Sequence, residues 1–270
     1  MEKKWKSLAR DLIGSELIER INDGNDVALL PVGSMELHGP QLPLGTDTYI
    51  AEAVCRLVAP KIKGTVFDTI TYSWSGMTKY SKPTISMTMD METSYVRMVC
   101  DQLLRIGLKR IYVIQFHGPG FALTRLAREF FEENGSPLAF YGLLRMPNNE
   151  MDEYQEKGIA WEASMYAAAS EMLGTTPNIN SDAAPPLDEI VLPPGSDARE
   201  KILETGGYVG MLGTNDLHHG PFEGRIDTEA GMNTMKRLAD DIASSAPSFK
   251  ELCDVWKGVD LSKSWPSSAK

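Results

Sequence analysis

The sequence predicts an α/β protein with a mainly parallel central sheet that helices cover on both faces. Short apolar runs, typical of buried strands, alternate along the chain with helical segments of about a dozen residues. A helix between two strands is the crossover that parallel neighbours need. The chain has 270 residues, of which 42% are hydrophobic and 24% charged, as is typical of a globular fold with a sizeable core.

The first element is the apolar run at residues 27–32, which suits a buried strand. Residues 48–59 follow as a helix, because their apolar side chains recur on one helical face, and Pro60 is expected to close it. Residues 65–72 are rich in β-branched and aromatic side chains and predict a second strand. These residues therefore predict a strand–helix–strand unit.

The middle of the chain repeats this alternation. Ser94 is the expected N-cap of a helix whose apolar side chains share one face, and Gly107 is expected to end it. Residues 110–116 form the clearest strand of the sequence. A turn containing glycine, a helix over residues 122–134 and a strand over residues 138–144 come next.

The last third of the chain is less regular. A helix rich in Ala and Met is expected over residues 158–173. Residues 177–194 contain five prolines and little periodicity, and long segments of that kind tend to be functional or disordered. A last short strand is expected at residues 209–213, followed by an amphipathic helix at residues 228–243.

Charge and composition exclude several classes of protein. The chain has 27 Lys and Arg against 37 Asp and Glu, and this net charge of −10 disfavours a nucleic-acid partner, because phosphates need a basic face. No apolar stretch approaches the roughly 18–20 residues of a membrane-spanning helix, and no signal-peptide core is present. The three cysteines are too far apart for a disulfide framework or a cysteine zinc cluster. We therefore expect a cytoplasmic protein without a nucleic-acid or membrane partner.

Only four histidines are present, so a site that contains histidine has few possible locations in the chain. His38 lies in the loop after the first predicted strand, and Glu36 precedes it by two residues, which puts both side chains on one side of an extended segment. Asp47 opens the next helix, and His117 lies directly past the strand at residues 110–116. Open α/β sheets bind ligands outside the carboxyl ends of their strands.

Two carboxylates and two imidazoles at neighbouring strand ends form a mixed nitrogen and oxygen site, which suits Zn, Mn or Fe(II). Taken singly, each of these residues could be a helix cap, a turn residue or a surface carboxylate. Taken together, they predict a metal site.

The same loop carries a family resemblance. Residues 33–47 read Gly-Ser-Met-Glu-Leu-His-Gly-Pro-Gln-Leu-Pro-Leu-Gly-Thr-Asp. This resembles the G-S-x-E-x-H-G-P-x-L-P-x-x-T-D signature of the creatininase (creatinine amidohydrolase) family. Weaker similarities to family elements occur at residues 83–86, 116–118, 162–164 and 224–231. The resemblance spans about residues 25–240 and implies one creatininase-like domain, placed at residues 1–257, with a loosely ordered tail at residues 258–270.

The resemblance implies a three-layer α/β/α sandwich, a divalent-metal-dependent hydrolase with one or two ions per subunit, and a homo-oligomer, often a hexamer. Four residues match the family's metal ligands: Glu36, His38, Asp47 and His117. Asp47 matches the ligand that bridges two ions. Ser75 falls where creatininase has a substrate-binding serine. The methionines at residues 87, 89 and 91 alternate along an edge-like stretch and are expected to face a neighbouring subunit.

The acid and base groups depart from the family pattern. Glu162 matches the acidic residue of the family's E-T-S element, but the histidine five residues before it, a proton shuttle in creatininase, is Lys157 here. A lysine would serve only if burial lowered its pKa. His218 and His219 are the alternative proton donors, or are exposed loop histidines. Pro119 also stands where creatininase has a further glutamate ligand, which argues against creatinine as the substrate.

These observations leave several functions open. The leading hypothesis is a metal-dependent hydrolase of a small cyclic substrate. The best-fitting reaction is ring-opening of an oxidised inositol (3-dehydro-scyllo-inosose) in inositol catabolism. The polar side chains expected around such a substrate are Ser75, Lys79, Tyr80 and Lys82. The alternatives are a creatininase-type cyclic amide or formamide amidohydrolase, and a non-catalytic assembly protein. A nucleotide-binding protein is disfavoured, because no glycine-rich phosphate motif follows a predicted strand.

Overall fold

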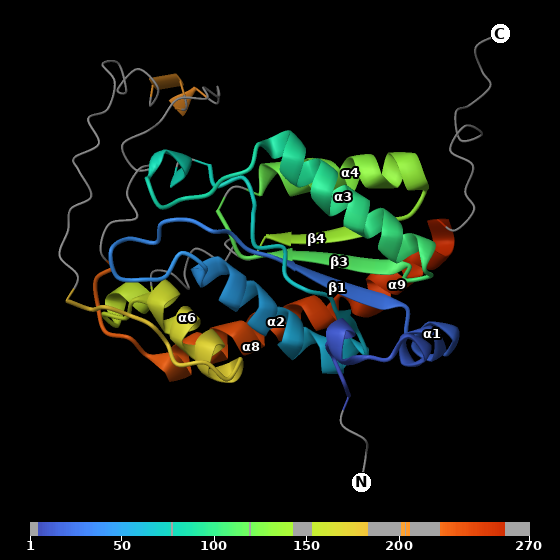
Figure 1. Cartoon of the computed structure of the whole chain (residues 1–270), viewed down its shortest axis with the longest axis horizontal. Coiled ribbons are helices and arrows are strands. Elements are labelled where there is room, and N and C mark those ends of the chain that lie inside the picture. The colour runs from blue at the N-terminus through green and yellow to red at the C-terminus, as the bar shows by residue number, and fades with distance from the viewer. Residues whose placement is uncertain are drawn as a thin grey trace.

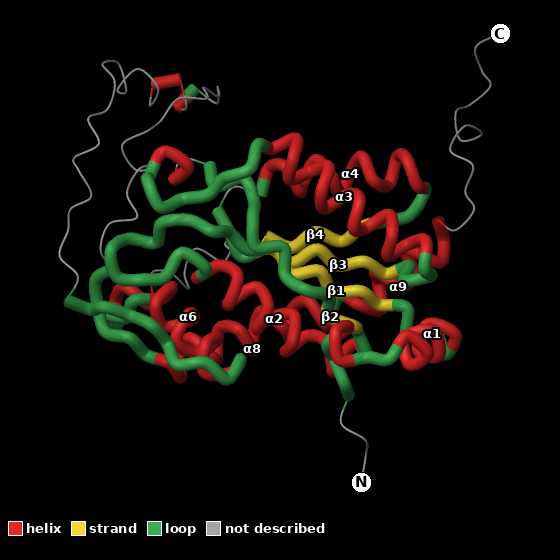
Figure 2. Tube along the Cα trace, viewed as in Figure 1, coloured by secondary structure: helices red, strands yellow, loops and turns green. Residues whose placement is uncertain are grey.

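The computed structural model describes residues 5–76, 78–118, 120–142, 153–182, 201–202, 204–205 and 222–256. Within this part of the chain, a sheet has the strand order β2-β1-β3-β4, and all of its strands are parallel. The strands are β1 (Val27–Val32), β2 (Thr65–Val66), β3 (Arg110–Gln115) and β4 (Leu138–Gly142). Figure 2 shows these strands side by side in the middle of the molecule.

Helices cover both faces of this sheet and make a three-layer α/β/α sandwich (Figure 1). One layer contains α2 (Thr46–Ile62), α6 (Trp161–Met172), α8 (Thr228–Ser244) and α9 (Ala246–Trp256). The opposite layer contains α3 (Met89–Arg105) and α4 (Phe121–Asn134). The shorter helices are η1 (Ala9–Asp11), α1 (Gly14–Asn22) and η2 (Thr78–Tyr80). The predicted fold class is confirmed.

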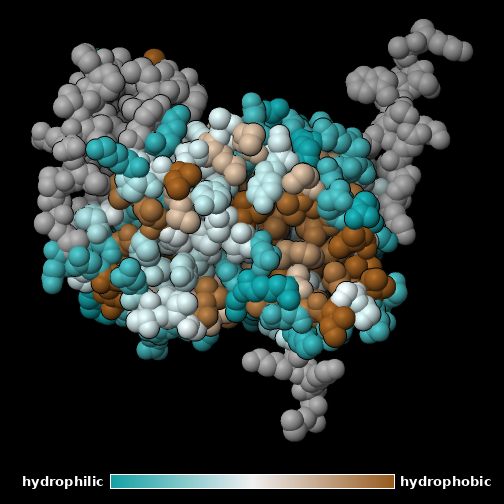
Figure 3. Space-filling model, in the orientation of Figure 1, coloured by the Kyte–Doolittle hydropathy of each residue, from teal (hydrophilic) through white to brown (hydrophobic). Residues whose placement is uncertain are grey.

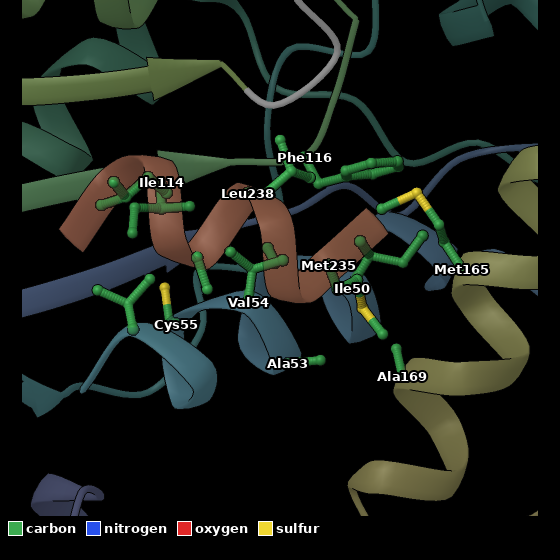
Figure 4. Close-up of a cluster of buried hydrophobic side chains, with 14 of the residues drawn as sticks. Ile50, Ala53, Val54, Cys55, Ile114, Phe116, Met165, Ala169, Met235 and Leu238 are labelled. Atoms are coloured by element: carbon green, nitrogen blue, oxygen red, sulfur yellow. The ribbon is translucent and has the colours of Figure 1, made fainter. Parts of the chain in front are cut away.

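The strands bury both faces because their side chains alternate between two cores. Leu29 of β1 belongs to the core beneath α2, α6 and α8, whereas its neighbour Leu30 belongs to the core beneath α3 and α4. Figure 4 shows the first core, with labelled side chains from α2 (Ile50, Val54), α6 (Met165), α8 (Met235, Leu238) and β3 (Ile114). A continuous apolar run such as residues 27–32 is therefore the expected pattern for a strand covered on both sides.

Three predicted boundaries were wrong. Pro60 does not end α2, which runs to Ile62 and is followed by Lys63 in the left-handed conformation. The helix tolerates this proline because the missing N–H removes only one hydrogen bond, close to the helix end. The strand expected at residues 65–72 contains only Thr65 and Val66, since β2 is a short edge strand and the following residues run beside β1 irregularly. The helix assigned to Ser94 begins earlier, at Met89, because the side chain of Thr88 accepts a hydrogen bond from the Met91 amide.

The other elements agree with the structure or lie outside the described residues. The strands at 27–32, 110–116 and 138–144 and the helices at 122–134, 158–173 and 228–243 are confirmed within a few residues. The strand at 209–213, the tail at 258–270 and most of the segment at 177–194 lie outside the described residues. The sequence reasoning did not predict α1 and α9. Among the described residues, no helix combines the length and apolarity needed to cross a bilayer.

Replacing Gly231 by alanine is expected to destabilise the protein. Gly231 of α8 packs against α6, and a Cβ atom there would lie 2.2 Å from the carbonyl oxygen of Ser164. Because backbone must move to relieve that overlap, we expect a loss of at least about 1–3 kcal/mol in the free energy of unfolding, measured by denaturant titration. Gly14→Ala is the control, because a Cβ on Gly14 meets nothing within 4 Å. Equal stability of the two variants would contradict this packing.

Candidate metal centre

The loop between β1 and α2 carries Glu36 and His38, and it is fixed against the first turn of α2, which carries Asp47. A Cβ atom on Gly33 would lie 2.5 Å from the Cα of Thr48, so glycine is required for this close approach. Thr48 Oγ1 donates a hydrogen bond to the carbonyl of Ser34 at 3.0 Å. Gly39, with a φ of 67°, turns the chain directly after His38. The loop is thereby held in one position above the carboxyl end of β1.

His38 joins the two ends of this loop. The carbonyl of Glu36 lies 3.0 Å from His38 Nδ1, which must therefore carry a proton and donate it. The other ring nitrogen, Nε2, lies 3.1 Å from Oδ1 of Asp47 at the start of α2. Asp47 Oδ2 in turn accepts a hydrogen bond from Ser34 Oγ at 2.7 Å.

His117, directly past β3, is held in the same way. Its Nε2 lies 2.9 Å from the carbonyl of Trp74 and donates to it. Its Nδ1 lies 2.8 Å from Glu36 Oε1 and 3.0 Å from Asp47 Oδ2. The structure therefore brings together all four residues that the sequence proposed as metal ligands, from the carboxyl ends of β1 and β3.

The four side chains form a site that requires a cation. Glu36, His38, Asp47 and His117 are 2–4% exposed, so water screens their charges poorly. In each histidine one nitrogen donates to a backbone carbonyl and the other faces carboxylate oxygens. A lone pair cannot face a carboxylate at about 3 Å without a proton or metal ion between them, and metal-binding histidines are held in this manner. Ligand atoms of Glu36, His38 and Asp47 lie within 4.8 Å of one another. This donor set fits Zn, Mn or Fe(II).

The pKa values of these groups likewise indicate that the site favours a bound positive charge. Burial acts to lower the pKa of His38, but the carboxylates of Asp47, Glu162 and Glu36 raise it to about 10. Burial likewise opposes the charge of His117, yet hydrogen bonds to Asp47 and Glu36 hold its pKa well above the ordinary value. Burial acts to raise the pKa of Asp47, but the two histidines lower it far below its usual range. Without a metal ion, both imidazoles therefore hold an extra proton.

Glu162 lies at the edge of this cluster, in the first turn of α6. Its Oε1 is 3.9 Å from His38 Nε2, and its side chain is 18% exposed. Burial, together with the nearby carboxylates of Asp47 and Glu36, raises its pKa to about 7, although the two histidines oppose that shift. A carboxyl group that titrates near neutral pH beside a metal site is suited to moving protons.

Ser75 lies beside the cluster. It is 2% exposed, and within the described residues its Oγ has no hydrogen-bond partner. The hydroxyl of Thr78 lies 2.8 Å from the Ser75 carbonyl and contacts the carboxylate of Glu36. Ser75 is therefore a buried polar group next to the ligands with its hydroxyl available. Lys79 and Lys82 are exposed.

Comparison with known proteins identifies the family. The creatininase profile, described as creatinine amidohydrolase, matches residues 12–211. The chain belongs to the creatininase family. A 112-residue segment is 29% identical to creatinine amidohydrolase of Pseudomonas putida and covers 40% of this chain and 43% of that enzyme. A 106-residue segment is 27% identical to 3-dehydro-scyllo-inosose hydrolase of Thermotoga maritima, covering 39% and 34%. The alignments thus span less than half of each relative.

Three further comparisons extend this result. A 36-residue segment is 61% identical to the mycofactocin precursor peptide peptidase of Mycobacterium ulcerans, covering 13% of this chain and 14% of that protein. A solved structure described as creatininase Mn superposes with a TM-score of 0.67 at 20% identity, covering 90% of this chain and 99% of that one. A creatininase variant of Zn-Zn type gives a TM-score of 0.67 at 19% identity, covering 90% and 99%. The creatininase fold therefore extends over most of the chain.

Of the alternative proton donors, the structure describes only Lys157. Lys157 is 62% exposed on its side chain, and its ammonium lies 3.4 Å from Glu153 Oε2. Lys157 therefore lacks the burial that the sequence analysis set as the condition for a lysine proton donor. His218 and His219 lie outside the described residues.

The sequence did not predict three groups that hold the proposed ligands in place: the hydroxyls of Ser34 and Thr78 and the carbonyl of Trp74. Ser34 lies inside the motif at residues 33–47, so its contact with Asp47 had a signal in the sequence. Thr78 lies 42 residues from its partner Glu36. The carbonyl of Trp74 is a backbone group that any residue would supply, so no sequence pattern marks it.

Metal binding is expected to release protons. Since the neighbouring carboxylates raise the pKa values of His38 and His117, and both rings must be neutral to bind metal, filling the centre should release about two protons in total at pH 7.5. The apparent affinity should therefore rise with pH, up to about 100-fold per pH unit, below the pKa of about 10 of His38. Calorimetric Zn²⁺ titrations in buffers with different ionisation enthalpies count these protons. Binding without proton release would contradict the assignment of these two ligands.

Proposed function

We propose that the protein is a divalent-metal-dependent hydrolase that attacks a carbonyl carbon of a small cyclic substrate with water. The observation that carries this proposal is the paired arrangement of His38 and His117, in which backbone carbonyls fix one ring nitrogen and carboxylates surround the other. When bound, a Zn or Mn ion supplies a Lewis acid and brings the pKa of a water molecule to near neutrality.

The side chains around the centre have separate roles in this proposal. Glu36, His38, Asp47 and His117 hold one or two ions, and Asp47 has an oxygen directed at each histidine. Ser75 Oγ binds the substrate, since it is buried beside the ligands without a partner among the described residues. Glu162 takes a proton from water and returns it to the leaving group, because its pKa of about 7 permits both steps.

We propose ring-opening of 3-dehydro-scyllo-inosose, a step of inositol catabolism, as the leading reaction. Glu162 takes a proton from the water that adds to one carbonyl of the diketone. The adjacent C–C bond then breaks, which leaves a carboxylic acid at that carbon, and the electron pair leaves as an enolate. The enolate carbon takes the proton back from Glu162. The similarity to the Thermotoga hydrolase supports this choice. The absence of a shuttle histidine at Lys157 and of the extra glutamate ligand at Pro119 argues against creatinine.

Cyclic amide hydrolysis is the second candidate, and the similarity to the Pseudomonas amidohydrolase favours it. The same groups would serve, because water again adds to a carbonyl and Glu162 then protonates the leaving nitrogen. The short match to the mycofactocin peptidase extends this chemistry to a peptide amide. These reactions differ in the bond that breaks, so product analysis distinguishes them.

A substrate panel tests the proposal. Protein loaded with Zn or Mn is incubated with 3-dehydro-scyllo-inosose, creatinine, a formamide, a lactone and a short peptide, and the products are identified by mass spectrometry. We expect turnover of the diketone and none by Asp47→Asn. Turnover of creatinine or peptide instead would replace the proposed substrate but keep the hydrolase. Metal-loaded protein inert toward every substrate would favour the non-catalytic assembly protein.

We also propose a homo-oligomer with cytoplasmic location. The methionines expected to alternate along an extended edge do not do so, because Met89 and Met91 lie in the first turn of α3. They are nevertheless 36% and 59% exposed. Other apolar side chains are exposed at the N-cap and along α1, namely Ile13 and Ile18, and Figure 3 shows hydrophobic surface in that region. Light scattering at micromolar concentration should return a multiple of 29.8 kDa, and a monomer mass would contradict the oligomer.

A further inference from the structure

Glu92 is a buried carboxylate that the proposed reaction does not use. It lies in the first turn of α3 and is 0% exposed. Its Oε2 accepts a hydrogen bond from the Trp74 amide at 3.3 Å, and its Oε1 accepts one from Gln115 Nε2 at 3.1 Å. Burying a carboxylate is costly, so two well-placed donors around it indicate a specific arrangement.

Both hydrogen-bond partners of Glu92 are connected to His117, one by a hydrogen bond and one along the chain. The carbonyl of Trp74 accepts the Nε2–H of His117, so Glu92 holds the same residue that fixes the histidine's tautomer. Gln115 is the last residue of β3, two positions before His117, so Glu92 also holds the end of the strand that delivers the histidine. One carboxylate therefore fixes the imidazole from two directions without touching it.

We infer that Glu92 is a positioning residue that keeps the Nδ1 of His117 aimed at the metal by orienting the Trp74 carbonyl and the end of β3. The inference rests on the proposed metal centre. Groups that orient a metal-binding histidine typically change metal affinity about 10–100-fold when they are removed. In this chain the effect passes through hydrogen bonds to Trp74 and Gln115, and not through the charge of Glu92.

Two conservative variants separate the hydrogen bonds from the charge. Glu92→Gln removes the charge but keeps an oxygen that can accept from the Trp74 amide. The new amide NH₂ can donate to Gln115 Oε1, which has no partner within the described residues, after rotation of that side chain. Glu92→Asp keeps the charge but is shorter by one methylene, which withdraws the acceptor from both donors.

The readout is Zn²⁺ affinity, measured in competition with a chromogenic chelator. We expect Glu92→Asp to bind Zn²⁺ about 10–100-fold more weakly than the unaltered protein and Glu92→Gln to bind nearly as tightly. The control is Val96→Ala, because Val96 is 0% exposed one turn along α3, and its loss loosens the same layer without removing either hydrogen bond. Its Zn²⁺ affinity should not change.

A second readout follows the tautomer itself. In the Zn²⁺-loaded protein labelled with ¹⁵N-histidine, the Nε2–H of His117 should exchange with solvent faster in Glu92→Asp than in Glu92→Gln. The reverse order of the two variants, in affinity or exchange, would assign the effect to charge and overturn the inference. Equal weakening by Val96→Ala would also overturn it. If the unaltered protein bound no Zn²⁺, the metal centre would itself be wrong, whereas tight binding by every variant would refute the role of Glu92 alone.

Discussion

Replacing Asp47 by asparagine is expected to remove the bound metal and the activity together. Asp47 directs one oxygen at each histidine, at 3.1 Å from His38 Nε2 and 3.0 Å from His117 Nδ1. An amide presents one oxygen and one NH₂ group, so one histidine would face a donor in place of an acceptor. The loss of affinity should exceed the roughly 10–100-fold that follows when a ligand's hydrogen-bond partner is removed.

The measurement is metal content by elemental analysis after dialysis, together with turnover of the best substrate of the panel. Asp227→Asn is the matched control, because Asp227 also begins a helix, where its side chain accepts from the Ala230 amide. Asparagine caps a helix as well as aspartate does, so this variant should keep both metal and activity. Full metal content in Asp47→Asn would refute the proposed centre.

Replacing Glu162 by glutamine is expected to lower kcat by roughly 10²–10⁴-fold while metal content stays unchanged. The carboxylate lies 3.9 Å from His38 Nε2, beyond a hydrogen bond, and at the exposed edge of the cluster. In the unaltered enzyme, kcat should rise with pH through the pKa of Glu162, since the carboxylate must accept a proton from water. That pKa is about 7 without metal, and a bound cation would lower it. Glu162→Gln should lose this limb of the pH–rate profile.

The other proton-donor candidates are the controls for this result. Lys157→Ala should keep kcat and the pH profile, because its ammonium is exposed and paired with Glu153. His218→Ala and His219→Ala test the donors that lie outside the described residues. If either histidine variant lost activity to the extent expected of Glu162→Gln, while Glu162→Gln remained active, the proton would come from that histidine.

The sequence predicted the parallel sheet because its strands carry unambiguous local signals. Residues 27–32 and 111–114 are short apolar runs, as strands buried on both faces require. The errors occurred where local signals are weak or misleading. Residues 65–72 have high β-propensity, but that propensity describes packing on a half-buried surface and does not require a partner strand. The start of α3 was missed because its first turn combines two exposed methionines with two acidic residues, so the buried apolar periodicity begins later.

The convergence of Glu36, His38, Asp47 and His117, the proposed ligand set, was determined by the sequence itself. The four side chains follow the carboxyl ends of two strands, and parallel strands present those ends at one edge of the sheet. Their convergence therefore follows from topology alone, and the family motif at residues 33–47 agrees with it.

Only the tertiary structure decided how those ligands are held and which acid lies beside them. The carbonyl of Trp74 contacts His117, and the carboxylate of Glu92 contacts the Trp74 amide. Both groups come from segments distant in sequence from His117, and the Trp74 groups belong to the backbone, where residue identity carries no signal. The position of Lys157 was decided in the same way, because its exposure depends on how the residues before α6 pack. A sequence records which chemical groups are present. Their solvation, and hence their pKa values and their ability to move protons, depends on which other segments cover them.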